Sequence, residues 1–334
     1  MTSLTRPAVR SMPRRLLTLC AVATLAGAAL PAAGQAAEWP SKPIRFVVGF
    51  APGGGTDLLA RVVAQPLAEA LGTSVIVENR PGGSGNISVS EVIRARPDGN
   101  TFLVAPTSVE TVNPSLFKAK FDPAKDLVPV GTIARMQMYL VGRNDLPADD
   151  TPGLVKMAKD NPNKLTYASS GSGTPPHLAG ELFAHLADIE VAHLPYKGSA
   201  PALQDVLGGH ADYVFDPGIA MPHIREQKVK LLGVASATRS KYFPDTPTLS
   251  EQGIAGAELD IWFGVWAPLK TPPEIIERLQ SELVKVLALP AVEQRFADAA
   301  TEAVARGGAE FRKLLDDERK LLEDLIETRN ITAD

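Results

Sequence analysis

Apolar residues along this chain alternate between short β-branched runs and stretches with helical spacing. Ile44 to Val48 is such a run, and it predicts a buried strand. A helix to about Leu71 is predicted after it from apolar residues at helical spacing, which are Leu58, Leu59, Val62, Val63 and Leu67. The loop between the two elements, residues 49–57, reads Gly-Phe-Ala-Pro-Gly-Gly-Gly-Thr-Asp.

The order of strand, loop and helix is repeated along the chain. Further strands are predicted at 74–78, 101–105, 165–168, 189–194, 213–215, 229–236 and 259–267. Further helices are predicted up to about 96, at 154–161, 177–186, up to 207, and at 272–287, 291–299 and 309–328. This alternation is typical of an α/β protein with parallel sheets, whose ligands bind at the carboxyl ends of the strands.

Two long apolar stretches, 127–143 and 259–267, are predicted to be strands that join two such α/β units. Two units joined in this way are typical of a hinged, two-lobed α/β protein. Pockets favour interfaces between lobes, and closure about the hinge strands is the expected motion.

The N-terminus predicts export. Four arginines precede an uncharged segment from Leu16 to Leu30, and small residues at positions 34 and 36 fit a signal peptidase site, so residues 1–36 are predicted to be a secretory signal peptide. Arg14-Arg15 leaves the twin-arginine export route open beside the Sec route. Removal of the signal peptide takes away four of the 34 basic residues, none of the 38 acidic ones, and the one cysteine. A mildly acidic mature chain argues against nucleic acid as a partner, and its stability must come from core burial rather than disulfides.

The loop at residues 49–57 has two interpretations. A glycine loop that leads from a strand into a helix N-terminus offers free N–H groups to an anion. The alternative is a tight turn in which Thr56 or Asp57 caps the helix. Gly55 is followed by Thr56-Asp57 rather than Lys-Ser/Thr, and G-x-G-x-x-G is absent, so neither nucleotide hydrolysis nor dinucleotide binding is predicted.

A second loop, Ser169-Ser-Gly-Ser-Gly-Thr174, repeats the device with four hydroxyls before a helix, and it favours ligand binding. Other strand ends supply further candidates, each with a plain turn or surface role as the alternative. These candidates are Thr107, Ser108, Tyr196, Lys197, Gly198 and Asp216. His177 begins a helix beside the second loop, where contact with a ligand is one interpretation, and a capping or surface role is the one we expect. The five histidines show no metal-ligand spacing, and Trp262 and Trp266 are expected in the core.

Several segments together resemble the Bug family, the periplasmic receptors of tripartite tricarboxylate transporters. The segments are Trp39–Ile44, Phe50–Asp57, Val77–Gly83, Pro97–Gly99, Asn113–Leu116, Tyr167–Thr174, His177–Phe183 and Pro195–Pro201. The resemblance covers essentially the whole mature chain. It implies a Venus-flytrap fold with lobe 1 at 37–140, lobe 2 at 141–257, and a return to lobe 1 with the C-terminal helices at 258–334. Pro217-Gly218 departs from the family, in which many members have Asn at this place.

The resemblance implies a monomeric binding protein that captures a small carboxylate and delivers it to membrane subunits similar to TctA and TctB. It implies no cofactor, no metal and no catalysis. The residues expected at the ligand are Phe50, Ala51, Gly53, Gly54, Thr56, Asp57, Thr107, Ser108, Ser169, Ser170, Gly171, Ser172, Gly173, Thr174, Tyr196, Lys197, Gly198 and Asp216. Two alternatives stay open: a periplasmic sensor for a signalling partner, and a serine hydrolase acting through Ser170 or Ser172.

Overall fold

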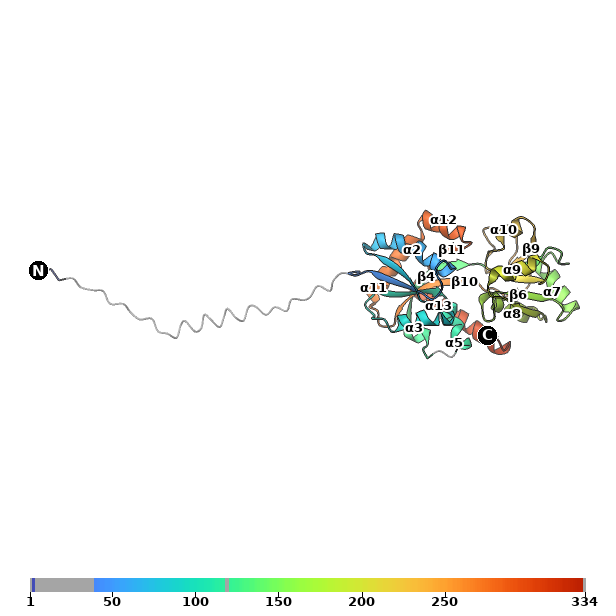
Figure 1. Ribbon diagram of the computed structural model, residues 1–334, viewed down its shortest axis with the longest axis horizontal. Coiled ribbons are helices and arrows are strands. Elements are labelled where there is room, and N and C mark those ends of the chain that lie inside the picture. The colour runs from blue at the N-terminus through green and yellow to red at the C-terminus, as the bar shows by residue number, and fades with distance from the viewer. Residues whose placement is uncertain (1, 4–38, 118–119, 333–334) are drawn as a thin grey trace. The chain divides into compact units, whose positions relative to one another are not determined.

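The computed structural model describes residues 2–3, 39–117 and 120–332, so the predicted signal peptide falls outside the described residues apart from two positions. From Trp39 onward the chain forms one compact unit that contains two β-sheets. Segments from both ends of this unit, blue and orange in Figure 1, share the first sheet, while the second sheet is built from the middle of the chain. We call each sheet with its helices a lobe.

The first sheet has six strands in the order β11-β4-β10-β3-β1-β2. They are β1 (Ile44–Val48), β2 (Val75–Asn79), β3 (Thr101–Pro106), β4 (Leu127–Met136), β10 (Ile261–Pro268) and β11 (Glu302–Ala303). β1 pairs in parallel with β2 and β3, whereas β10 is antiparallel to both β3 and β4. The parallel pairing predicted for the first strands is confirmed, but the sheet as a whole is mixed, because β10 returns from the far end of the chain and runs antiparallel to its neighbours.

Helices cover both faces of this sheet. They are α2 (Gly55–Leu71), α3 (Asn86–Ile93), α4 (Ser108–Thr111), α5 (Asn113–Leu116), α6 (Pro123–Asp126), α11 (Pro273–Leu287), α12 (Pro290–Asp298) and α13 (Gly308–Thr328). On one face Leu59 and Val63 of α2 pack with Leu279 and Leu283 of α11. On the other face Trp266 packs against Phe311 of α13, which confirms the core role expected for this tryptophan.

The second sheet has five strands in the order β7-β6-β8-β5-β9. They are β5 (Tyr139–Arg143), β6 (Thr166–Ser169), β7 (Ala192–Pro195), β8 (Tyr213–Asp216) and β9 (Val229–Val234). β6 is parallel to β7 and β8, and β5 is antiparallel to β8 and β9. Its helices are α7 (Thr151–Asp160), α8 (Pro175–Ala187), α9 (Ser199–Leu207) and α10 (Met221–Arg225), of which α10 was not predicted.

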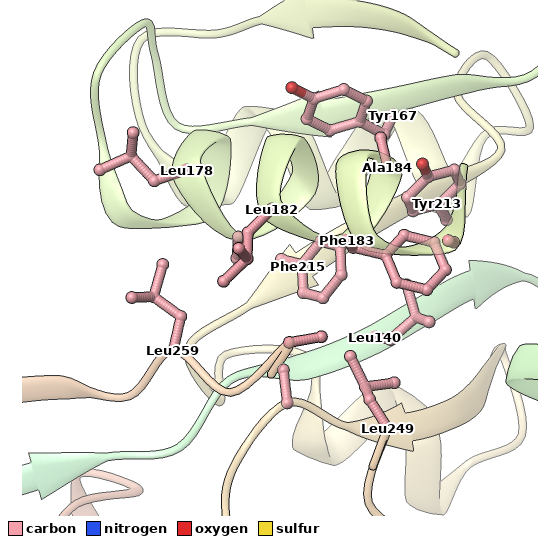
Figure 2. Close-up of a cluster of buried hydrophobic side chains, with 14 of the residues drawn as sticks. Leu140, Tyr167, Leu178, Leu182, Phe183, Ala184, Tyr213, Phe215, Leu249 and Leu259 are labelled. Carbon is pink, nitrogen blue, oxygen red and sulfur yellow. The ribbon is translucent and has the colours of Figure 1, made fainter. Parts of the chain in front are cut away.

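The core of the second lobe is centred on α8. Leu182 and Phe183 point from this helix toward Phe215 and Leu140 of the sheet (Figure 2). Full burial of an aliphatic or aromatic side chain of this size contributes about 1.5–3 kcal/mol, so α8 is held firmly and its N-terminus is well positioned.

Three segments connect the lobes. The chain passes from β4 to β5 through residues 137–138 and returns through residues 235–260, where Ala235 N donates to Met138 O (2.8 Å) and Leu259 N donates to Ala235 O (3.0 Å). α13 is the third connection, because its first half packs in the first lobe while Leu322 and Leu325 join the core of the second. The lobe boundaries at 140/141 and 257/258 stay predictions.

Candidate functional site

The loop at residues 49–57 turns from β1 into α2 through glycines that the geometry requires. A Cβ on Gly49 would lie 2.5 Å from Ser88 Oγ and 2.7 Å from Gly85 Cα, and Gly53 has φ +82°. The N-cap of α2 is Gly54, and the cap makes no side-chain hydrogen bond. The first N–H groups of a helix have no partner within the helix, so this end of α2 offers amides and the positive end of the helix dipole to an anion.

Asp57 stabilises this loop rather than capping the helix. Its carboxylate accepts from Gly53 N (2.8 Å), Asn79 Nδ2 (2.9 Å) and Arg61 Nε (3.0 Å), and the residue is buried. Burial by itself raises the pKa of Asp57, but these hydrogen bonds outweigh it and lower the pKa. Both oxygens are therefore occupied by protein donors, and the pairing with Arg61 offsets a negative charge that would otherwise repel an anion at this helix end.

Asn79 is a residue of this site that the sequence analysis missed. It ends β2, the strand beside β1, and its Nδ2 also donates to Phe50 O (3.0 Å). The amide thus holds both ends of the loop. The signal that could have found it is the rule already applied to β1 and β3, since the carboxyl ends of neighbouring parallel strands meet at one edge.

Thr107 and Ser108 follow β3 at the same edge of the sheet, but the hydrogen bonds of Thr107 are to α13 and β10. Its Oγ1 donates to Glu318 Oε1 (3.0 Å) and its backbone N–H donates to Trp262 O (2.9 Å). Thr111 Oγ1 also donates to Glu318 Oε1 (3.0 Å), and Oε2 of this glutamate is buried without a hydrogen-bond partner. Burial raises the pKa of Glu318 from 4.5 to about 7. Thr107 therefore connects the first sheet to α13.

The loop Ser169–Thr174 is folded by its own hydroxyls. Ser170 Oγ donates to Thr174 Oγ1 (3.0 Å), and Thr174 Oγ1 donates to Gly171 O (2.6 Å). Thr174 is the N-cap of α8 and makes no side-chain cap hydrogen bond. α8 begins with Pro175 and Pro176, which have no N–H group, so this helix start differs from that of α2 and leaves half-buried Ser172 as the candidate donor of the loop.

The loop at residues 196–198 lies directly beside Ser169–Thr174. Tyr196 N donates to Ser169 O (3.0 Å) and Gly198 N donates to Ser170 O (3.2 Å). The hydroxyl of Tyr196 donates to Asp205 on α9, and the side chain of Lys197 is exposed. The structure thus brings these two predicted loops together.

Asp216 ends β8 at the same edge and acts first as a turn residue. Its Oδ1 accepts from Gly218 N (2.7 Å) and Ala220 N (2.8 Å), while Oδ2 is buried with no hydrogen-bond partner. Burial raises the pKa of Asp216 from 3.8 to about 6, against the opposing effect of these amides. A Cβ on Gly218 would lie 2.8 Å from Ala300 Cβ, so this turn approaches the first lobe.

His177 differs from the expectation of a capping or surface residue. It is 7% exposed, and its Nδ1 accepts from Gly173 N (2.9 Å). Its ring stacks on His193 with 3.9 Å between centroids and 6° between planes, and His193 Nε2 lies 2.7 Å from Ser169 Oγ. Long-range stacking buries a residue that appears isolated in the sequence.

The two lobes also meet at the second loop. A Cβ on Gly173 would lie 2.5 Å from Leu116 Cδ1 at the end of α5. Asn113, in the same helix, donates through Nδ2 to Ser84 O (3.0 Å), in the loop that supports Gly49. The first and second glycine loops are therefore linked through α5, and their direct approach to one ligand stays a prediction.

A cavity of about 660 Å³ lies away from the glycine loops, lined in part by Arg135, Asp260, Trp262, Arg306 and Glu318. The guanidinium of Arg306 lies over the Trp262 ring at 4.2 Å from its centroid, and Arg135 pairs with Glu302 (2.6 Å). Trp262 is buried, but it lines this cavity rather than joining the apolar core with Trp266.

The described residues hold no candidate metal site and no candidate membrane-spanning helix. Among residues 2–3, 39–117 and 120–332, no group of three His, Cys, Asp or Glu side chains is placed to hold a metal ion. Within the same ranges no helix combines the length and apolar character needed to cross a membrane.

Two mixed sheets joined by crossing strands, with glycine loops at helix N-termini along their edges, define a two-lobed α/β protein of the periplasmic-binding-protein type. The family model described as "Tripartite tricarboxylate transporter family receptor" matches residues 59–331. The chain belongs to this family, TctC, also known as the Bug family, whose members are periplasmic solute-binding proteins.

Individual relatives agree with this assignment. Protein BugT of Bordetella pertussis is 34% identical over 300 residues, which cover 88% of this chain and 91% of BugT. An R. palustris protein solved with adipate is 31% identical, covers 89% of this chain and 100% of its own, and superposes with a TM-score of 0.75. MatC from Rhodopseudomonas palustris, solved with bound malate, is 30% identical, covers 86% of this chain and 100% of its own, and has a TM-score of 0.71.

Proposed function

We propose that this chain is a periplasmic receptor that captures a small carboxylate between its two lobes and delivers it to membrane subunits of a tripartite tricarboxylate transporter. The observation that carries the proposal is the N-terminus of α2, where the N-cap Gly54 provides no side-chain acceptor for the first amides of the helix. Adipate and malate in the two related structures support a carboxylate as the ligand class.

The recognition we propose uses neutral donors. Backbone amides of the α2 first turn and the amide and hydroxyl of Ser172 in the second loop would bind the carboxylate, and Gly198 with its neighbours would complete the site. Buried charges without partners are costly, so a site built from amides leaves the ligand-free protein without an unpaired buried cation. The side chain of Asp57 would hold the first loop, and Lys197 would attract the anion from its exposed position.

A hydrolase fits these contacts less well. Of the two candidate nucleophiles, Ser170 donates to Thr174 and Ser172 is half-buried, whereas the serine of this loop that contacts His193 is Ser169, which is fully buried. Neither arrangement gives an exposed nucleophile beside a base, as nucleophilic catalysis requires.

The first experiment is a thermal-shift screen of the refolded, ligand-stripped mature protein with adipate, malate and small monocarboxylates. A ligand that binds only the folded state adds about 2.7 kcal/mol of stability at a hundredfold excess over Kd. Absence of a shift with every acid would refute the carboxylate assignment.

The second experiment tests whether the ligand binds at the N-terminus of α2. Gly55 has an ordinary φ, and a Cβ on it would meet no atom within 4 Å, so Gly55→Leu fits the ligand-free fold. We expect this change to weaken carboxylate binding at least tenfold, because leucine would occupy the space in front of the helix amides. Gln65→Leu, at an exposed position of the same helix, is the control. Equal affinities of the two variants would show that the ligand does not bind at this helix end.

A further inference from the structure

A buried polar network lies beneath the loop Ser169–Thr174. His193 contacts Ser169 at the start of the loop, and His177 contacts Gly173 near its end. The two imidazoles stack in parallel at 3.9 Å. Together they support both ends of the loop whose amides we propose to bind the carboxylate.

The network continues away from the loop to the end of α13. His177 Nε2 lies 3.9 Å from Glu181 Oε1, one turn further along α8. Glu181 accepts from Tyr167 Oη (2.6 Å) through Oε1 and from Arg329 Nε (2.7 Å) through Oε2. Burial by itself raises the pKa of Glu181, but these two hydrogen bonds and the nearby charges outweigh it and lower the pKa.

The direction of one hydrogen bond fixes the protonation state of His177. Because Gly173 N–H donates to Nδ1, that nitrogen carries a lone pair, and the ring proton is on Nε2, which faces Glu181. A proton added to Nδ1 would turn this nitrogen into a donor that faces the N–H of Gly173, and the hydrogen bond between them would be lost. The contact of His193 with Ser169 differs, because a hydroxyl both donates and accepts.

We propose that His177 is a positioning residue for the ligand-binding loop, which it holds in the binding conformation only while Nδ1 is unprotonated. This inference rests on the proposed function. It predicts that the affinity of the receptor for the carboxylate falls as the pH is lowered through the range in which histidine titrates, which is near pH 6.5 for an unperturbed side chain.

Charged and titratable groups face His177 from several elements. They are Glu181 on the same helix, Tyr167 on β6, Tyr213 on β8 behind Tyr167, His193 on β7 and, through Glu181, Arg329. The carboxylate of Glu181 favours a proton on His177. Arg329 and a protonated His193 oppose it, because each would place a second positive charge nearby.

In the test, Kd for adipate and for malate is measured at pH 5.5 and at pH 8.0, and for each protein the two pH values are compared. Loss of one hydrogen bond that orders the site corresponds to about a 3- to 10-fold rise in Kd at the lower pH for the wild type. In His177→Asn the side-chain oxygen occupies the place of Nδ1 and does not titrate, so the rise beyond the titration of the ligand itself is expected to disappear. In His177→Gln the acceptor is displaced from Gly173, and binding is expected to be weak at both pH values.

His185→Asn is the matched control, because His185 lies exposed on the same helix. It is expected to keep the pH dependence of the wild type. If His177→Asn also keeps that pH dependence, the inference is overturned.

A second measurement needs no ligand. In ligand-free wild-type protein the amide proton resonance of Gly173 is expected to shift as His177 titrates, and this shift is expected to be absent in His177→Asn. A Gly173 resonance that responds equally in both proteins would overturn the inference even if no carboxylate bound. Absence of binding with a normal Gly173 titration would instead refute the proposed function and leave the positioning role intact.

Discussion

Replacing Glu318 by glutamine is expected to stabilise the protein above pH 7 and to have little effect near pH 4. The carboxyl group accepts hydrogen bonds from the hydroxyls of Thr107 and Thr111 through Oε1, whereas Oε2 is buried without a hydrogen-bond partner. Glutamine has nearly the same shape, and its amide oxygen keeps both threonine bonds. It removes the negative charge that this environment solvates poorly, and its NH2 group takes the position of Oε2, where the protonated carboxyl of the wild type would carry its O–H.

The size of the effect follows from linkage. The pKa of Glu318 is raised from 4.5 to about 7, so the folded state holds a proton that the unfolded state has lost between these values. Stability is therefore complete below pH 4.5 and falls as the pH rises through 7. At about 1.4 kcal/mol per pKa unit the loss is at most on the order of 3 kcal/mol. Glu318 as a whole is only partly buried, so we expect about 1–3 kcal/mol.

The assay is urea unfolding of wild type and Glu318→Gln at pH 4.5, 6 and 8. The difference between the proteins is the quantity to follow, because Asp260, whose pKa burial raises to about 6, contributes a similar slope to both. Glu323→Gln, at an exposed position of α13, is the control and should change little. A Glu318→Gln protein that is less stable than wild type at pH 8 would refute the reasoning, since it would show that the ionised carboxylate gains more from its threonines than it loses by burial.

Two further changes test the packing around the glycine loops. Asp57→Asn is expected to lower the free energy of unfolding by about 1–2 kcal/mol at pH 7, because Arg61 loses its ion pair. Since the pKa of Asp57 is lowered, this deficit should vanish as the pH falls through that pKa. Urea unfolding at pH 7 and pH 3 measures the deficit, and equal values at the two pH values would contradict the prediction. Gly180→Ala is expected to lower the free energy of unfolding by about 1–3 kcal/mol through overpacking, because its Cβ would lie 2.2 Å from Tyr167 Cε2. Gly55→Ala is the control, since its Cβ would meet no atom within 4 Å. Equal urea midpoints for the two variants would contradict the packing argument.

Local pattern predicted much of the fold. The strand at Ile44–Val48, the helix to Leu71 and the apolar stretch from Leu127 to Arg143 were all confirmed, the last as two strands that belong to different sheets. The prediction failed where pairing is not local. β10 joins β3 from about 160 positions away and reverses the expected parallel order, while α10 was missed because five residues that include Pro222 carry no periodicity.

The candidate site shows the same limit. The glycine loops were visible as composition, and the family resemblance gave their order. The partners that hold them were not visible, because Asn79 reaches Asp57 from the end of the neighbouring strand and His177 meets His193 only when α8 packs on the sheet. Sequence alone identified the loops that offer amides, but not which polar side chains are already occupied by protein partners.

The helix α13 has a consequence for how this chain acquires its structure. Phe311 and Leu315 complete one face of the first lobe, and Leu322, Leu325 and Ile326 complete the core of the second. Both cores therefore lack part of their apolar lining until residues 308–328 have been synthesised. A fragment that contained all five strands of the second sheet but ended at residue 260 would expose that surface to water. Domains often fold as units from the N-terminus during synthesis, but this chain must wait for its last described helix, which favours a loosely folded nascent chain.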